Sequence, residues 1–281
     1  MSQNYHIAAD SCTDVTKEMR QDSGLKLVPL TLRVGNQQML DDESFNQHAF
    51  LDAVDQNEEV PHSACPSPGA FCEAYGEDNV DAYGITLSSK MSGSYNSALL
   101  GAKILQEDFP EKRIHVFDSK SAACGQTLIL MKLKECLNAG FSFDKTVAAV
   151  EKYIKEQSTV FVLETIDMLR KNGRLSNLEG TLLTALNIKP ILGSTPEGEV
   201  KKVGIGRGMK QSLKKLMDYI GETVIDPANK YLAITHCNCL ARAEWLKEEI
   251  MKRYPFKDVL IFDAAGVSSL YAGRGGIVVA Y

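Results

Sequence analysis

Short apolar runs alternate with helical patterns through the first half of the chain. Four apolar runs predict strands, at residues 5–9, 25–34, 83–87 and 114–117. Helical patterns follow them, at residues 14–21, 46–54, 92–109 and 125–139. Ser67 followed by Pro68 marks a further helix start, because serine caps free N–H groups and proline loses nothing in a first turn. This alternation is typical of a parallel sheet with right-handed crossovers.

The pattern changes near residue 159. Strands are predicted at residues 160–163, 188–192, 200–205, 231–236, 259–262 and 277–281. Helices are predicted at residues 166–171, 176–186 (after a capping box), 209–223 and 241–254. Pro196 and Gly198 lie in a turn between two of these strands and indicate a hairpin, so this sheet should be mixed.

These elements predict an α/β protein of two domains with a ligand site between them. Residues 1–158 should form a three-layer α/β/α domain around a parallel sheet, and residues 159–281 an α/β domain with a mixed sheet. A chain of 281 residues is long enough for either two modest domains or one large one.

Composition narrows the classes of function. The net charge of −5 comes with no basic stripe, which argues against nucleic acid as a partner. We expect no signal peptide, because no basic segment followed by a long apolar core opens the chain, and no membrane span, because no apolar run approaches about 18 residues. A cytoplasmic location is therefore expected.

Cysteine and histidine spacing gives no sign of a metal site or a disulfide framework. The chain has seven cysteines, an odd number, and they are scattered, so we expect reduced thiols. The five histidines are isolated in the sequence, so we expect no metal. The glycines at 204, 206 and 208 do not fit a dinucleotide-binding fingerprint, and there is neither a Walker A sequence nor a G-x-S-x-G elbow. No cofactor is expected.

The turn at residues 88–94 is the most informative candidate site. An apolar strand enters a Ser/Gly-rich turn that opens a helix, which leaves backbone N–H groups free beside the positive end of the helix dipole. The hydroxyl groups of Ser92 and Ser94 can join those donors around an anion. This pattern predicts a site for a small acidic head group.

Other loops could contribute to the same site or to a different chemistry. Ser63 lies on a proline-stiffened loop, Arg174 follows a helix end, and Tyr271 opens a glycine-rich turn. Asp10 and Asp118 end strands beside serines, and they support the alternative hypothesis that the protein is an enzyme. That enzyme would be a phosphotransferase or hydrolase acting on a small acidic substrate between the domains.

Taken in order, these loops resemble those of the DegV family, the fatty-acid-binding subunits of bacterial fatty acid kinases. The family's Asp-Ser-Thr turn, Thr-Ser-x-Pro-Ser loop, Leu-Ser-Gly-Thr-Tyr-x-Ser turn, Phe-Asp-Ser, Gly-Gly-Arg and Lys-Pro-Ile-Leu are matched in sequence at residues 10–11, 63–67, 91–97, 117–119, 172–174 and 189–192. The resemblance covers essentially the whole chain. One departure is that Tyr271 and Arg274 replace the His and Pro of a family turn, which puts a kinase partnership in doubt.

The resemblance implies a non-catalytic protein that binds a long-chain fatty acid of the palmitate or oleate class. The acyl tail would lie in a tunnel between the domains. The carboxylate would be held by the following residues: Ser63, Ser92, Gly93 and Ser94, with His62, Arg174 and Tyr271 as candidates for accessory contacts. The implied partner is a fatty acid kinase resembling dihydroxyacetone kinases, or an acyl-transfer enzyme.

Overall fold

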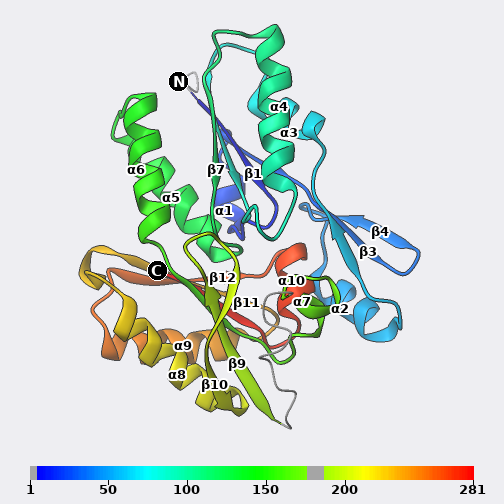
Figure 1. Ribbon diagram of the computed structural model, residues 1–281, viewed down its shortest axis with the longest axis vertical. Helices are drawn as coiled ribbons and strands as arrows, with labels where there is room; N and C mark the ends of the chain where they lie inside the picture. The colour runs from blue at the N-terminus through cyan, green and yellow to red at the C-terminus, as the bar shows by residue number, and fades with distance from the viewer. Residues whose placement is uncertain (1–4, 176–186) are drawn as a thin grey trace.

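The computed structural model describes residues 5–175 and 187–281, and it contains two large sheets and one small one (Figure 1). The parallel sheet lies within the first 118 residues, and the mixed sheet is built from strands that begin at Thr159. The predicted α/β fold class is confirmed.

The first large sheet has the strand order β2-β1-β6-β7, and every neighbouring pair is parallel. Its strands are β1 (Tyr5–Asp10), β2 (Leu25–Val28), β6 (Asp81–Thr86) and β7 (Ile114–Asp118). Its covering helices are α3 (Pro68–Tyr75), α4 (Ser94–Asp108), α5 (Cys124–Asn138) and α6 (Phe143–Glu156). Successive side chains of β1 point to opposite faces of this sheet, and each face is covered by two helices. Ala8 packs with α3 and α4, whereas Ile7 and Ala9 pack with α5 and α6.

The single strand predicted at residues 25–34 is wrong, because Pro29 divides it between two sheets. A proline has no N–H to donate to a ladder, which disfavours the continuation of a strand. After it, β3 (Thr31–Val34) pairs antiparallel with β4 (Gln37–Leu40) and with β5 (His62–Ala64). This small sheet carries Ser63 away from the parallel sheet.

The mixed sheet has the order β10-β9-β8-β13-β11-β12, and only β11 and β12 are parallel neighbours. Its strands are β8 (Thr159–Val162), β9 (Ile188–Ser194), β10 (Val200–Arg207), β11 (Tyr231–His236), β12 (Asp258–Asp263) and β13 (Ile277–Ala280). The helices α8 (Gly208–Thr223) and α9 (Leu240–Arg253) cover one face. α5 packs on the other face, against β11 and β13. The predicted hairpin is confirmed as β9 and β10.

The remaining helices depart from the predicted pattern in several places. The helix predicted at 14–21 is shortened to α1 (Lys17–Arg20), capped by Thr16, because Asp14 is buried in contacts with the second half of the chain. Two α-helices, α6 and α10 (Gly266–Ala272), and the short 3-10 helix η2 (Pro227–Asn229) were not predicted. The remaining two predicted helices are α2 (Gln47–Gln56) and α7 (Asp167–Lys171). The helix predicted at 176–186 lies outside the described residues.

Candidate functional site

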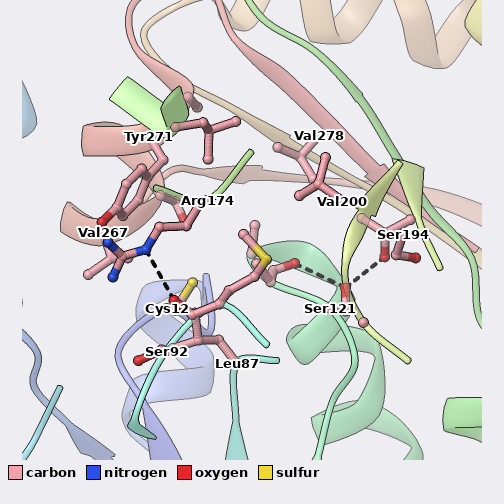
Figure 2. A pocket seen from close by; sticks show the side chains of 18 of the residues that line it. Cys12, Leu87, Ser92, Ser121, Arg174, Ser194, Val200, Val267, Tyr271 and Val278 are labelled. Carbon is pink, nitrogen blue, oxygen red and sulfur yellow. Dashed lines mark hydrogen bonds between the residues drawn. The ribbon is translucent and has the colours of Figure 1, made fainter. Parts of the chain in front are cut away.

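A cavity of about 330 Å³ lies between the loops that follow the parallel strands and one face of the mixed sheet (Figure 2). Its volume is at the lower end of the range of about 300–1,000 Å³ that is usual for small-molecule sites. The walls are mainly apolar and include Cys12, Leu30, Leu87, Leu163, Leu169 and Val267. Parallel sheets commonly bind ligands at the carboxyl ends of their strands, and this cavity has that position.

Polar side chains gather at one end of the cavity. Ser63 from β5 and Tyr271 from α10 meet there, with 3.0 Å between their hydroxyl oxygens. The guanidinium group of Arg174 lies 5.8 Å from the centre of the Tyr271 ring, and its Nε donates to the carbonyl of Met91 at 3.2 Å. Figure 2 shows Arg174, Tyr271 and Ser92 together at this end. A hydroxyl pair beside a fixed cation suits the recognition of a carboxylate.

The turn between β6 and α4 supplies the rest of this polar end. Ser92 Oγ accepts a hydrogen bond from the backbone N–H of Ser94 at 3.1 Å, so its own O–H remains able to donate to a ligand. Gly93 also lines the cavity, and a Cβ at this position would lie 3.2 Å from the Cys65 sulfur. The absence of a side chain at Gly93 therefore allows the turn to pack closely against the loop that contains Ser63.

Two buried carboxyl groups position α10, which carries Tyr271. Asp41 accepts hydrogen bonds from the backbone N–H groups of Gly266 and Val267 at 2.6 and 2.9 Å. Asp14 accepts from the N–H of Ala265 at 2.8 Å and from a threonine hydroxyl in β11. Burial raises the pKa of Asp41, and it raises that of Asp14 to about 7. These contacts tie the N-terminal part of the chain to the helix that forms the polar end.

Two of the predicted site residues do not line the cavity. The Ser94 side chain is fully buried at the start of α4 and lies outside the lining. His62 is exposed, and its Nδ1 lies 2.8 Å from Oδ1 of Asn172. This contact holds Asn172, the residue that caps the C-terminal end of α7 near Arg174, on the outer side of the cavity wall. Arg274, which follows Tyr271 in the glycine-rich turn, forms surface ion pairs with Asp52 and Asp55.

The aspartates of the enzyme alternative are engaged elsewhere in the structure. Asp10 is fully buried, and its two oxygens accept from the Leu87 N–H and the Gln126 amide, both at 2.8 Å. Burial raises its pKa to about 6. Asp118 forms an ion pair with Lys120 at 2.6 Å. Neither aspartate lines the cavity, so this arrangement does not support an acid–base role for them there.

Sequence reasoning missed most of the residues that form the cavity wall. Apolar side chains such as Leu163, Val200 and Val278 have the same pattern as any core residue, so no local signal could identify them. A polar group at the other end, comprising Ser121, Thr159 and Ser194, was also missed. The position of Ser121 in the turn after β7, the fourth parallel strand, was the one available signal.

Within residues 5–175 and 187–281, no cluster of histidine, cysteine, aspartate and glutamate side chains is arranged to hold a metal ion. None of the helices in that part of the chain has the length and apolar character needed to cross a membrane.

Comparisons with known proteins agree over nearly the whole chain. The model of the DegV family, whose members it describes as uncharacterised proteins, matches residues 4–281. A DegV domain-containing protein of Streptococcus pyogenes serotype M18 is 32% identical over 280 residues, which is 99% of each chain.

Solved structures of similar proteins contain bound fatty acids. A DegV family protein of Ruminococcus gnavus with vaccenic acid is 43% identical and has a TM-score of 0.95, with 99% of each chain covered. The Fatty Acid Kinase (Fak) B3 protein of Streptococcus pneumoniae, loaded with linoleic acid, is 31% identical with a TM-score of 0.90 and the same coverage. A Eubacterium eligens DegV family protein loaded with heptadecanoic acid is 29% identical, with a TM-score of 0.90 and 98% of each chain covered.

Proposed function

Because this chain belongs to the DegV family, we propose that it binds a long-chain fatty acid in the cavity between its two large sheets. One observation carries the proposal: an apolar cavity has hydroxyl groups and a guanidinium group gathered at one end. An alkyl chain needs the apolar walls, and a carboxylate needs the polar end. A fatty acid has both parts, and similar structures contain bound fatty acids.

The carboxylate is held by Ser63, Ser92 and the backbone of Gly93. Tyr271 donates through the hydroxyl that contacts Ser63, and Arg174 supplies the positive charge. Ser94 acts through its backbone N–H, which fixes the position of the Ser92 oxygen. Charge-assisted hydrogen bonds of this kind contribute about 1.5–3 kcal/mol each.

The acyl tail supplies most of the affinity. Each buried methylene group contributes about 0.8 kcal/mol, so the roughly fourteen of palmitate contribute about 11 kcal/mol and outweigh three head-group hydrogen bonds, which contribute about 9 kcal/mol at most, before the costs of binding are counted. The tail lies between two domains, residues 1–158 and 159–281, whose contact forms the cavity. The polar end then sets the orientation of the ligand, with its carboxylate at the Ser63–Tyr271 pair.

The protein is a non-catalytic carrier that acts in the cytoplasm and presents the carboxylate to a kinase or acyl-transfer partner. Seven free cysteines are consistent with a reducing compartment. A fatty acid kinase resembling dihydroxyacetone kinases is the candidate partner, because the similar protein of Streptococcus pneumoniae is a fatty acid kinase B3 protein.

Native mass spectrometry of protein purified from cells, followed by lipid extraction, tests the proposal. We expect about one equivalent of a long-chain fatty acid, or uptake of added palmitate or oleate by protein from which lipid has been removed. Protein that arrives without lipid and takes up neither acid would contradict the proposal.

We expect Ser63→Ala and Ser92→Ala each to weaken palmitate binding by about tenfold to a hundredfold, because each removes one hydrogen bond to a charged group. Isothermal titration calorimetry measures the effect. Ser94→Ala is the matched control, since its hydroxyl lies outside the cavity, and it should leave the affinity nearly unchanged. Equal losses in all three variants would show that the effect is not at the head group.

A further inference from the structure

The end of the cavity opposite the Ser63–Tyr271 pair is lined by hydroxyl groups. Ser121 follows β7, Thr159 begins β8 and Ser194 ends β9. Figure 2 shows Ser121 and Ser194 on the far side of the cavity from Tyr271. A pocket that receives only the methyl end of an alkyl chain has no use for polar groups there.

The hydrogen bonds at this end leave capacity for a ligand. Ser121 Oγ and Thr159 Oγ1 are 2.6 Å apart, and both side chains are buried. Ser121 can also donate to the carbonyl of Ala122 at 3.4 Å. Each hydroxyl oxygen has two acceptor lone pairs, so the pair can still accept from a ligand O–H. The backbone of Ser194 pairs with Val200 in the β9–β10 ladder, whereas its hydroxyl has no hydrogen-bonding partner among the described residues and can donate to the same ligand oxygen.

A polar cleft of about 670 Å³ lies beyond these hydroxyl groups and shares them as lining, together with Lys120. Its other cationic residues are Lys90, Lys155 and Lys201, and its acidic ones are Asp118 and Glu151. Asp118 is paired with Lys120, and Glu151 with His115. The far end of the cavity therefore adjoins a polar and cationic region. A ligand hydroxyl group at this end is not buried among apolar side chains without a hydrogen-bonding partner.

From these observations we infer that the site accepts long-chain fatty acids that carry a hydroxyl group at or near the end remote from the carboxylate. The inference rests on the proposed function and adds the class of fatty acid. The carboxylate binds at the Ser63–Tyr271 pair, the methylene groups pass Val200 and Val278, and the distal hydroxyl binds Ser121, Thr159 and Ser194. An alkyl chain that ends in a methyl group offers these three hydroxyl groups no hydrogen-bonding partner.

Calorimetry with three plain saturated acids (tetradecanoic, hexadecanoic and octadecanoic) and their ω-hydroxy counterparts tests the inference. We expect at least one ω-hydroxy acid to bind as tightly as its plain counterpart or more tightly. An end built only of alkyl groups would instead weaken every ω-hydroxy acid by about tenfold or more, because the hydroxyl would lose its water without gaining a partner. That result, with plain acids bound normally, overturns this inference and leaves the proposed function standing.

Two variants locate the effect. Ser121→Ala combined with Thr159→Val should weaken the best ω-hydroxy acid by about tenfold relative to its plain counterpart, and Ser194→Ala alone should shift the ratio in the same direction. Thr86→Val is the control, because the hydroxyl of this buried threonine has no partner in the described part of the chain and does not line the cavity. An unchanged ratio in both site variants overturns the inference, and failure of every acid to bind the unmodified protein overturns the proposed function as well.

Discussion

The Val278→Trp variant is expected to bind palmitate at least a hundredfold more weakly than the unmodified protein while it keeps its fold. Val278 lies on β13 with its side chain on the cavity wall, between the two polar ends (Figure 2). An indole ring there occupies space that the alkyl chain needs, and displacing only four methylene groups costs about 3 kcal/mol. Calorimetric titration with palmitate, together with a thermal melt, measures both quantities.

Val278→Ala is the matched control for this experiment. It enlarges the cavity at the same position and leaves the polar ends unchanged, so palmitate should bind within about tenfold of the unmodified protein. Retained binding by a well-folded Val278→Trp protein would place the ligand elsewhere and contradict the site.

We expect the free energy of unfolding to fall by several kcal/mol between about pH 5 and about pH 8. For each carboxyl group with a raised pKa, this free energy falls by about 1.4 kcal/mol per pH unit between the unfolded and the folded pKa of the group. Burial raises the pKa of Asp10 to about 6 and that of Asp14 to about 7. Both values exceed the 3.8 of an unperturbed aspartate, so the folded state holds protons that the unfolded state has released. This stabilisation is complete below the unfolded pKa and is lost as the pH rises through the folded values. Urea titrations at a series of pH values measure it.

Asp14→Asn should flatten this dependence, because an amide does not ionise. Its oxygen can accept from the Ala265 N–H and its NH₂ group can donate to Thr235 Oγ1, so both contacts across the structure can be kept. Asp226→Asn, at an exposed turn, should keep the slope of the unmodified protein. If Asp14→Asn shows the same slope as the unmodified protein, Asp14 does not carry a raised pKa.

Local sequence features determined most of the elements and several features of the candidate site. The strand at Tyr231–His236, the β9–β10 hairpin and the Ser67 cap all follow from patterns confined to a few neighbouring residues. The order of the loop motifs along the chain also indicated the family. These motifs indicated the following candidate site residues from the sequence alone: Ser63, Ser92, Arg174 and Tyr271. Turn and cap chemistry is local, so it can be read without the fold.

Only the tertiary structure decided which residues meet. The division of residues 25–34 at Pro29 created the small sheet that brings Ser63 to within 3.0 Å of Tyr271, which lies 208 positions later in the chain. The same packing turned Ser94 away from the cavity and enclosed Asp10 and Asp14 as hydrogen-bonded structural groups. A leucine or valine on a cavity wall has the same pattern as one in a filled core. Whether space remains between such side chains depends on the packing of distant segments, which periodicity along the chain does not record.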